Sequence, residues 1–430
     1  MPNALVLRPA AAVFIAVAGL LSSQTILAAG APLTLRQAQR LAVERSRQVA
    51  ARDASASASR EMAIAAGELP DPVLRAGIDN LPVDGADRFR IGDDFMTMRR
   101  IGVTQEFTRS EKLRLRSQRF ELEAEKSLAE KDASIAAVER DTALAWLDRH
   151  YAESIAVLVD RQMGEARLEI EAAASAYRGA RGSQADIFAA RSALATLEDH
   201  ASEAARRVRT AQVALERWVG DAARYPLAGE PSTDAIRADL GSLEAHLRSH
   251  PEIEALVRQE EIAATEAKLA QADKKADWSV ELMYSQRGPA FSNMVSIGVS
   301  VPLQWNPARR QDREIAAKLA LAEEARAARD DMFRAHVAEV RAMAIEWKSD
   351  RERRARYDAE IIPLAAQRTQ AALGAYRGGK SSLTEVLAAR GAELEVRLQA
   401  LRLAQETAGL WARLEFLFPI DAEMKMKESK

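Results

Sequence analysis

Two histidines and four methionines are the residues of this chain best suited to bind a metal. His246 and His250 stand four apart near the start of a predicted helix, a spacing at which two imidazoles can share one cation. On a charged helix such a pair is more often solvated. The methionines fall in or near predicted strands, where thioethers can line a path for soft metals but more often fill space: Met96, Met98, Met283 and Met294. We therefore predict no resident metal.

No arrangement of residues predicts an enzyme. The chain has no nucleophile elbow, phosphate loop, His/Glu zinc motif or paired acids, and Asp93 and Asp94 are typical of a solvated loop. Its 61 basic and 63 acidic residues leave no basic excess to favour nucleic acid. The absence of cysteine excludes disulfides and thiolate metal sites. We expect no catalysis, no cofactor and no nucleic-acid partner.

One stretch occurs twice, and each copy carries an acid, Asp186 in the first and Glu385 in the second. The copies are AYRGARGSQADIFAAR at 176–191 and AYRGGKSSLTEVLAAR at 375–390, and eight of the sixteen positions are identical. Each copy joins two long helical patterns through a Gly/Ser turn, so each predicts the tip of a helical hairpin. A repeat about half the chain apart indicates internal duplication.

The sequence predicts the same order of elements in each half of the chain: helix, strand, strand, long helix, turn, helix. The first half covers 30–220, with strands at about 72–81 and 96–107 and a tip at about 177–184. The second covers 242–420, with strands at about 278–286 and 291–304 and a tip at about 376–383. A linker at 221–241 joins them and a charged tail fills 421–430. Pro363 predicts a kink in the second long helix.

Residues 1–29 have the layout of a secretory signal peptide. Arg8 precedes an apolar run at 10–21, and small residues follow to Ala29. An N-terminal membrane anchor is the alternative, although the run is short for a spanning helix. No other stretch resembles a transmembrane helix.

The predicted strands alternate between apolar and small or polar residues. This pattern fits either half-buried hairpins of a soluble sheet or strands that cross a membrane between lipid and a lumen. The length of about nine to eleven residues, the signal peptide, and Trp278 and Trp305 near strand ends favour the membrane. Four strands cannot close a barrel, and an open edge in lipid leaves backbone groups unpaired. The chain must then oligomerise, and three copies give twelve strands.

The repeated tip resembles that of TolC-type outer-membrane efflux channels, with Tyr-Arg, a Gly-containing turn, Ser, an acid and an aliphatic pair before an Ala/Arg helix. Residues 297–303 and 101–107 resemble the ends of that family's strands, with Glu106 in place of the usual proline. Pro307-Ala308 stands where a Gly pair is often found. NLPVDGADRF at 80–89 and QEFTRSEKLRLR at 105–116 resemble the family's heavy-metal branch, which exports cobalt, zinc and cadmium or copper and silver.

The resemblance implies a mainly α fold with a membrane β-barrel. In this TolC-like fold, two structural repeats give each chain four transmembrane strands and long coiled-coil helices. A homotrimer then forms a 12-stranded barrel in outer-membrane lipid and an α-helical tunnel in the periplasm of a Gram-negative bacterium.

The implied function is the exit duct of a tripartite efflux system. It would work with a periplasmic adaptor and an inner-membrane RND pump, and it would export heavy-metal cations. A duct for drugs or for type I protein secretion is an alternative with the same fold. A soluble periplasmic coiled-coil adaptor is a third possibility.

In the family the tip meets the adaptor, and the resemblance carries that role to residues of both copies: Tyr177, Arg178, Gly179, Gly182, Ser183, Tyr376, Arg377, Gly378, Gly379 and Ser382. Gly379 matches the family's turn glycine, whereas Ala180 holds that place in the first copy, so we expect the first turn to differ in shape. Glu385 matches one acid of a constricting ring, and Ala388 stands where some relatives have a second. Asp186 and Glu385 either ring the tunnel entrance or stabilise helix starts.

Overall fold

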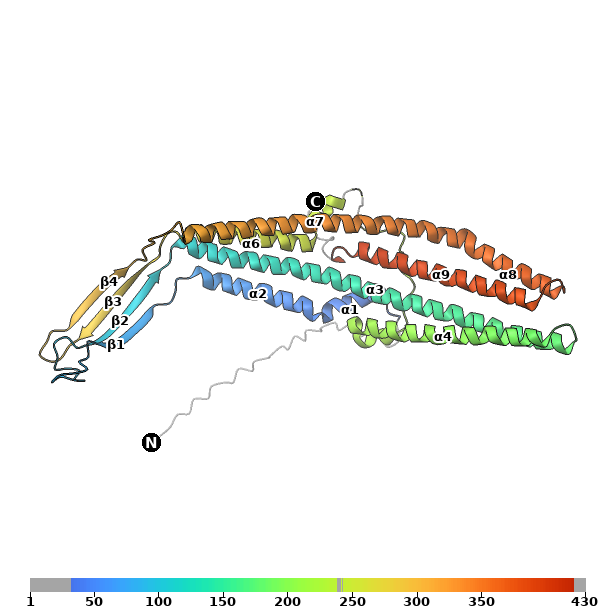
Figure 1. The fold of residues 1–430 in the computed structure, drawn as a ribbon, viewed down its shortest axis with the longest axis horizontal. Helices are drawn as coiled ribbons and strands as arrows, with labels where there is room; N and C mark the ends of the chain where they lie inside the picture. Colours follow the sequence, from blue (N-terminus) through green and yellow to red (C-terminus); the bar gives the residue numbers. More distant parts are fainter. Residues whose placement is uncertain (1–31, 238–240, 242, 421–430) are drawn as a thin grey trace, which may run out of the picture.

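The computed structural model describes residues 32–237, 241 and 243–420 as a long bundle of helices with a four-stranded sheet at one end (Figure 1). The predicted signal peptide and charged tail lie outside the described residues. No helix among those described is long and apolar enough to cross a membrane.

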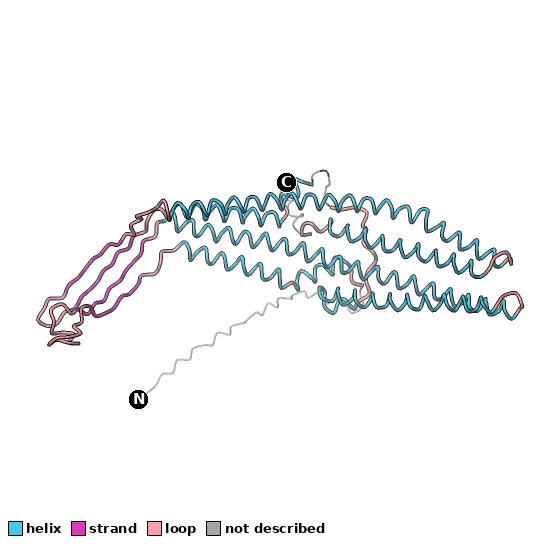
Figure 2. Tube along the Cα trace, viewed as in Figure 1, coloured by secondary structure: helices cyan, strands magenta, loops and turns pink. Residues whose placement is uncertain are grey.

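The two halves contain matching elements in the same order. Figure 2 shows that the strands gather at one end of the chain and that helices form the rest of the bundle. The first half has α1 (Leu35–Arg45), α2 (Arg47–Gly67), β1 (Val73–Asp79), β2 (Met98–Phe107), α3 (Ser110–Arg178), α4 (Gln184–Val219) and the short 3-10 helix η1 (Gly220–Arg224). The second half has α5 (Leu243–Arg248), α6 (Pro251–Ala272), β3 (Trp278–Gln286), β4 (Met294–Ser300), α7 (Gln311–Arg356), the π-helical turn η3 (Tyr357–Ile361), α8 (Ile362–Arg377) and α9 (Leu383–Glu415).

The long helices follow from the scarcity of helix breakers. α3 has 69 residues and no proline, so at a rise of about 1.5 Å per residue it extends for about 100 Å. Its counterpart in the second half is interrupted before Pro363, which lacks an N–H and clashes with the preceding turn. The kink predicted there takes the form of the wide turn η3 between α7 and α8.

The sheet is antiparallel in the order β1-β2-β3-β4. Its register places Val103 opposite Leu282, and Leu282 opposite Ile297, so apolar residues of neighbouring strands share one face. That face is uncovered in the single chain, where Ile297 is 76% exposed. On the other face, Gly102 allows close approach to the next strand, because an added Cβ would lie 2.5 Å from the Leu282 carbonyl oxygen.

The last strand is shorter than the sequence predicts. β4 covers Met294–Ser300, whereas the predicted strand covers about 291–304. β4 lies at an edge of the sheet and pairs only with β3 among the described strands. Alternation reports which residues share a face, but a strand also needs a backbone partner, and this edge has none within the described chain.

Two tryptophans in the middle of the bundle form hydrogen bonds with the connecting segments. Trp146 of α3 is fully buried and its Nε1 donates a hydrogen bond to the Leu33 carbonyl oxygen at 3.0 Å. Trp411 of α9 donates to the Ala235 carbonyl oxygen at 2.8 Å. These bonds satisfy the indole N–H groups within the largest buried apolar cluster of the described residues.

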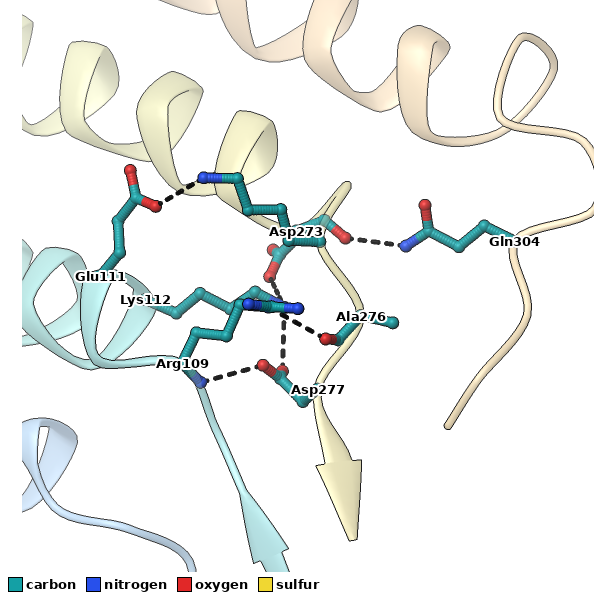
Figure 3. Close-up of polar contacts among 8 residues, drawn as sticks. Arg109, Glu111, Lys112, Asp273, Ala276, Asp277 and Gln304 are labelled. Carbon is teal, nitrogen blue, oxygen red and sulfur yellow. Dashed lines mark hydrogen bonds and ion pairs between the residues drawn. The ribbon is translucent and has the colours of Figure 1, made fainter. Parts of the chain in front are cut away.

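A polar network fixes the bend between helices and sheet (Figure 3). The Lys112 side chain is only 4% exposed, and its Nζ lies 2.9 Å from Asp277 Oδ2 and 3.2 Å from Asp273 Oδ1. The Arg109 backbone N–H donates to Asp277 Oδ1 at 3.0 Å. The Gln304 amide donates to the Asp273 carbonyl oxygen at 3.0 Å. The corners after β2, before β3 and after β4 are therefore joined to one another.

Candidate functional site: the paired hairpin tips

The two repeated stretches form neighbouring hairpin tips at the end of the bundle opposite the sheet (Figure 1). One tip joins α3 to α4 and the other joins α8 to α9. Apolar residues of both tips meet in one small buried cluster formed by Ala173, Ala190, Leu383 and Val386. The duplication thus places its two copies in contact with each other.

The two turns have the same shape, so the expectation that Ala180 makes the first turn different is wrong. Ala180 has a φ of 56° and Gly379 a φ of 69°, both in the left-handed region. In each turn, two consecutive N–H groups bond back to the end of the preceding helix. Ala180 and Arg181 donate at 3.0 and 2.9 Å, and the second turn repeats both bonds at 2.9 Å. These bonds satisfy the last helical carbonyls and offset the strain at Ala180.

The two acids at equivalent positions have different environments. The Asp186 carboxylate accepts hydrogen bonds from the Ser183 N–H at 2.8 Å and hydroxyl at 2.9 Å, and the Asp186 N–H returns one to Ser183 Oγ. This reciprocal arrangement caps the start of α4. Ser382 caps α9 by accepting from the Glu385 N–H at 3.4 Å. The Glu385 carboxylate is exposed and has no hydrogen-bond or ion-pair partner within the described part of the chain.

The residues expected to contact an adaptor lie at the tips, but the copies differ in exposure. Tyr177 is 49% exposed, whereas Tyr376 is half-buried against the cluster that joins the tips. Gly182 is also half-buried. An added Cβ at this position would lie 3.1 Å from the Ala176 Cβ. The others are exposed: Arg178, Gly179, Ser183, Arg377, Gly378, Gly379 and Ser382.

An ion-pair cluster joins the two hairpins behind the tips, and the sequence analysis did not find it. Arg390 of α9 pairs with both Glu165 and Glu169 of α3. Burial raises the pKa of the Glu169 carboxyl, and the charge of Arg390 opposes that shift. Two acids four residues apart are visible in the sequence, but their partner lies on a helix of the other repeat.

The histidines do not form the pair that the sequence suggested. His246 lies in α5, whereas His250 precedes α6 and caps it by accepting the Glu252 N–H at Nδ1, at 3.3 Å. The His250 ring lies 4.4 Å from that of His336. Burial, followed by the charge of His336, lowers the pKa of His250 to about 4. Among the described residues, no group of three or more His, Asp or Glu side chains is placed to hold a metal ion.

No family model matches this chain, and no curated protein matches its sequence. Solved structures share its fold. The outer membrane protein VceC from Vibrio cholerae is 18% identical with a TM-score of 0.74, over 89% of this chain and 95% of that one. CusC is 13% identical with a TM-score of 0.75, over 89% and 91%. The CmeC outer membrane channel of Campylobacter jejuni is 14% identical with a TM-score of 0.75, over 92% and 88%.

These likenesses confirm the predicted fold class, a mainly helical TolC-like chain with long helices and a small sheet. The structures that share the fold are channel proteins and not enzymes. At this level of identity they establish the fold alone.

Proposed function

We propose that this chain is the outer-membrane exit duct of a tripartite efflux system and that it works as a homotrimer. The observation that supports this most strongly is a sheet with an uncovered apolar face beside helices about 100 Å long. A contiguous exposed apolar face of this kind marks an interaction with lipid or protein.

The sheet supports a barrel made by several copies. β1 and β4 are its edges, and unpaired backbone groups at an edge are costly in lipid. Since successive strands alternate in direction, β4 of one copy can pair antiparallel with β1 of the next. Three copies then give twelve strands, and the apolar residues of β4 face lipid: Val295, Ile297 and Val299.

The helices support a tunnel that continues the barrel. Near the tips they form one layer in the order α4, α3, α9, α8 (Figure 1). Its two outer helices carry exposed apolar side chains, including Phe188 of α4 and Leu364 of α8. A neighbouring copy on each side would cover these residues and close the layer into a ring.

The tips are the proposed contact with a periplasmic adaptor, which would link the duct to an inner-membrane RND pump. Glycines at both turns expose backbone, and Tyr177 and Arg178 offer an aromatic ring and a charge beside it. The proposed location is the outer membrane of a Gram-negative bacterium, with the helices in the periplasm. The signal peptide expected at 1–29 would direct the chain there.

Heavy-metal cations are the substrates that we propose. The sequence resemblance to the heavy-metal branch favours them, and so does the free Glu385 carboxylate. Three copies of Glu385 around the tunnel axis would favour cations. Because Asp186 is engaged in the cap of α4, the proposed ring holds three carboxylates and not six.

Fractionation and export assays test this function. The mature protein should be recovered in the outer membrane as a trimer that chemical cross-linking captures. A strain lacking it should lose resistance to metal cations such as Co²⁺, Zn²⁺ or Cu⁺ while organic drugs are exported as before. Recovery of a soluble periplasmic monomer would instead identify an adaptor or scaffold, and loss of drug export alone would reject the metal substrate.

A further inference from the structure

The seam inside one chain joins β2 of the first repeat to β3 of the second, and polar contacts close it at the corner between sheet and helices (Figure 3). Asp277, directly before β3, accepts the Arg109 backbone N–H at 3.0 Å and lies 2.9 Å from Lys112 Nζ. Lys275 and Glu111 form a second ion pair across the same corner, at 3.1 Å. Strand pairing and these charges together hold the two repeats in one register.

The duplication gives this seam a counterpart at the outer edges of the chain. Val103 of β2 lies opposite Leu74 of β1, and Val299 of β4 lies opposite Val280 of β3. β4 therefore corresponds to β2, and β3 to β1, residue by residue. Beside the sheet the helices form a layer in the order α2, α3, α6, α7, so α2 and β1 lie at one edge and α7 and β4 at the other (Figure 1).

This correspondence specifies a register for β4 against β1 of the next copy. Inside the chain, Val103 pairs with Leu282. Val299 corresponds to Val103 and Ala76 to Leu282, so Val299 should lie opposite Ala76 of the next copy. Residues 301 and 303, beyond the end of β4, would then lie opposite residues 74 and 72 and gain the partner strand that they lack in the single chain.

The charges at the two outer corners complement each other. The strand correspondence equates Asp277 with Asp71, which is exposed and has no ion-pair partner among the described residues. Along the helices, the offset between the two repeated stretches equates Lys112 with the neutral Gln311. Exposed arginines surround Gln311 in the corner after β4: Arg309, Arg310 and Arg313. Arg310 lies 3.9 Å from exposed Glu314, and the other two arginines have no ion-pair partner in the part of the chain that the structure describes.

The second ion pair of the inner corner is not repeated at the outer corners. Leu69 takes the place of Lys275, and Arg310 takes the place of Glu111. An acid kept at position 310 would repel Asp71 of the next copy and would have no base to meet at position 69. Because both members of the pair are exchanged, Asp71 would face positive charge alone.

We propose that an inter-copy ion-pair cluster, formed by Asp71 of one copy and Arg309, Arg310 and Arg313 of the next, sets the register of the seam between copies. Alternation alone cannot set this register. A slip of one residue turns every side chain to the other face, but a slip of two residues keeps the apolar face outward. Such a slip shifts the strands by about 7 Å and moves Asp71 out of line with the arginines. This inference rests on the proposed assembly into a ring.

Disulfide cross-linking tests the register in the full-length mature protein in outer membranes. The chain has no cysteine, and Ala76 and Val299 lie on opposite edges of one sheet, so a disulfide between cysteines at these positions joins two copies. Ala76→Cys combined with Val299→Cys should give covalent trimers on mild oxidation, because Cβ atoms of directly opposite residues approach to about 4.5–5.5 Å. Ala76→Cys combined with Ile297→Cys or with Val301→Cys is the matched control. These pairs report a slip of two residues, and in the proposed register they lie about 7–8 Å apart and should give little product.

Charge reversal tests the ion-pair cluster in the purified trimer. Asp71→Arg should speed trimer dissociation by about tenfold, equivalent to about 1.4 kcal/mol, because each copy that leaves breaks two such seams. Arg310→Glu should also speed dissociation, and the two substitutions together should return the rate toward that of the parent. Asp84→Arg is the matched control, since it makes the same change at an exposed acid in the loop between β1 and β2, at the other end of the sheet. It should dissociate like the parent.

The possible results separate the register, the ion pairs and the assembly. Trimers in which a control pair cross-links in place of positions 76 and 299 would overturn the register. An Asp71→Arg variant that dissociates like Asp84→Arg, or a combined variant that dissociates no more slowly than Asp71→Arg, would overturn the ion-pair cluster. Either result leaves the trimeric duct intact. A parent protein that remains monomeric would overturn this inference together with the proposed function.

Discussion

Ala180 and Gly379 take the same left-handed backbone conformation at equivalent positions of the two hairpin turns. Glycine suits this conformation, whereas a residue with a side chain, such as Ala180, costs about 1–2 kcal/mol there. The first turn keeps its shape because the bonds from the Ala180 and Arg181 N–H groups close it as they do in the second turn. The two tips are therefore alike in shape but unlike in strain.

Exchange of these residues should change the stability of the turns in opposite directions. Gly379→Ala should destabilise the second turn by about 1 kcal/mol, although its new Cβ meets open space. Amide hydrogen exchange at Lys380 should then be about fivefold faster. Ala180→Gly should slow exchange at Arg181. Gly378→Ala is the control, because Gly378 has a φ of −79° and room for a side chain. Equal effects at 378 and 379 would contradict the strain argument.

The two faces of β4 should differ in their tolerance of charge. Val299 pairs with Val280 on the apolar face, and Ser300 pairs with Ser279 on the other face. In the proposed barrel, Val299→Arg places a charge toward lipid, which costs about 2–4 kcal/mol near the midplane. We expect loss of assembled trimer from the outer membrane. Ser300→Arg should assemble nearly as well as the parent, and comparable losses from both variants would refute the assignment of faces.

Substitutions at Glu385 and Asp186 should have different effects. We expect Glu385 to affect ion selectivity and Asp186 to affect helix stability. In the proposed trimer, Glu385→Gln should abolish the expected cation preference in a planar bilayer, with little change in thermal stability. Asp186→Ala should leave ion selectivity unchanged and cost about 1 kcal/mol of helix stability, because it removes the reciprocal cap with Ser183. Unchanged selectivity in Glu385→Gln would remove Glu385 from the pore.

The local features of this fold could be predicted from the sequence, whereas the contacts between repeats could not. Continuous helical periodicity without proline predicted α3, and Pro363 predicted the interruption that η3 makes. The pairing of Arg390 with Glu165 depends on which helix of the other repeat lies beside α3, and residue spacing along one helix carries no such information. The capping role of His250 was missed because the sequence suggested one helix through both histidines, whereas α5 ends before His250 and α6 begins after it.

His250 should make the stability of the bundle depend on pH. It is 5% exposed, and its surroundings include His336 of α7, Arg140 and Asp141 of α3, and Arg413 of α9. Its pKa is about 4 in the folded chain, against an ordinary value of 6.5 that the unfolded chain retains. The unfolded chain therefore binds more protons between these values, and stability falls as the pH drops from 6.5 toward 4. Full protonation of this group corresponds to a loss of about 3 kcal/mol.

His250→Asn isolates this contribution, because asparagine can cap α6 by accepting the Glu252 N–H but does not titrate. The thermal unfolding midpoint of the parent should fall more steeply than that of His250→Asn between pH 6.5 and pH 4. Carboxylates titrate in both proteins, so the difference between the two curves reports His250. His246→Asn is the matched control, since it makes the same substitution at an exposed position of α5. If His250→Asn keeps the parent's full pH dependence while His246→Asn reduces it, the buried imidazole of His250 is not the titrating group.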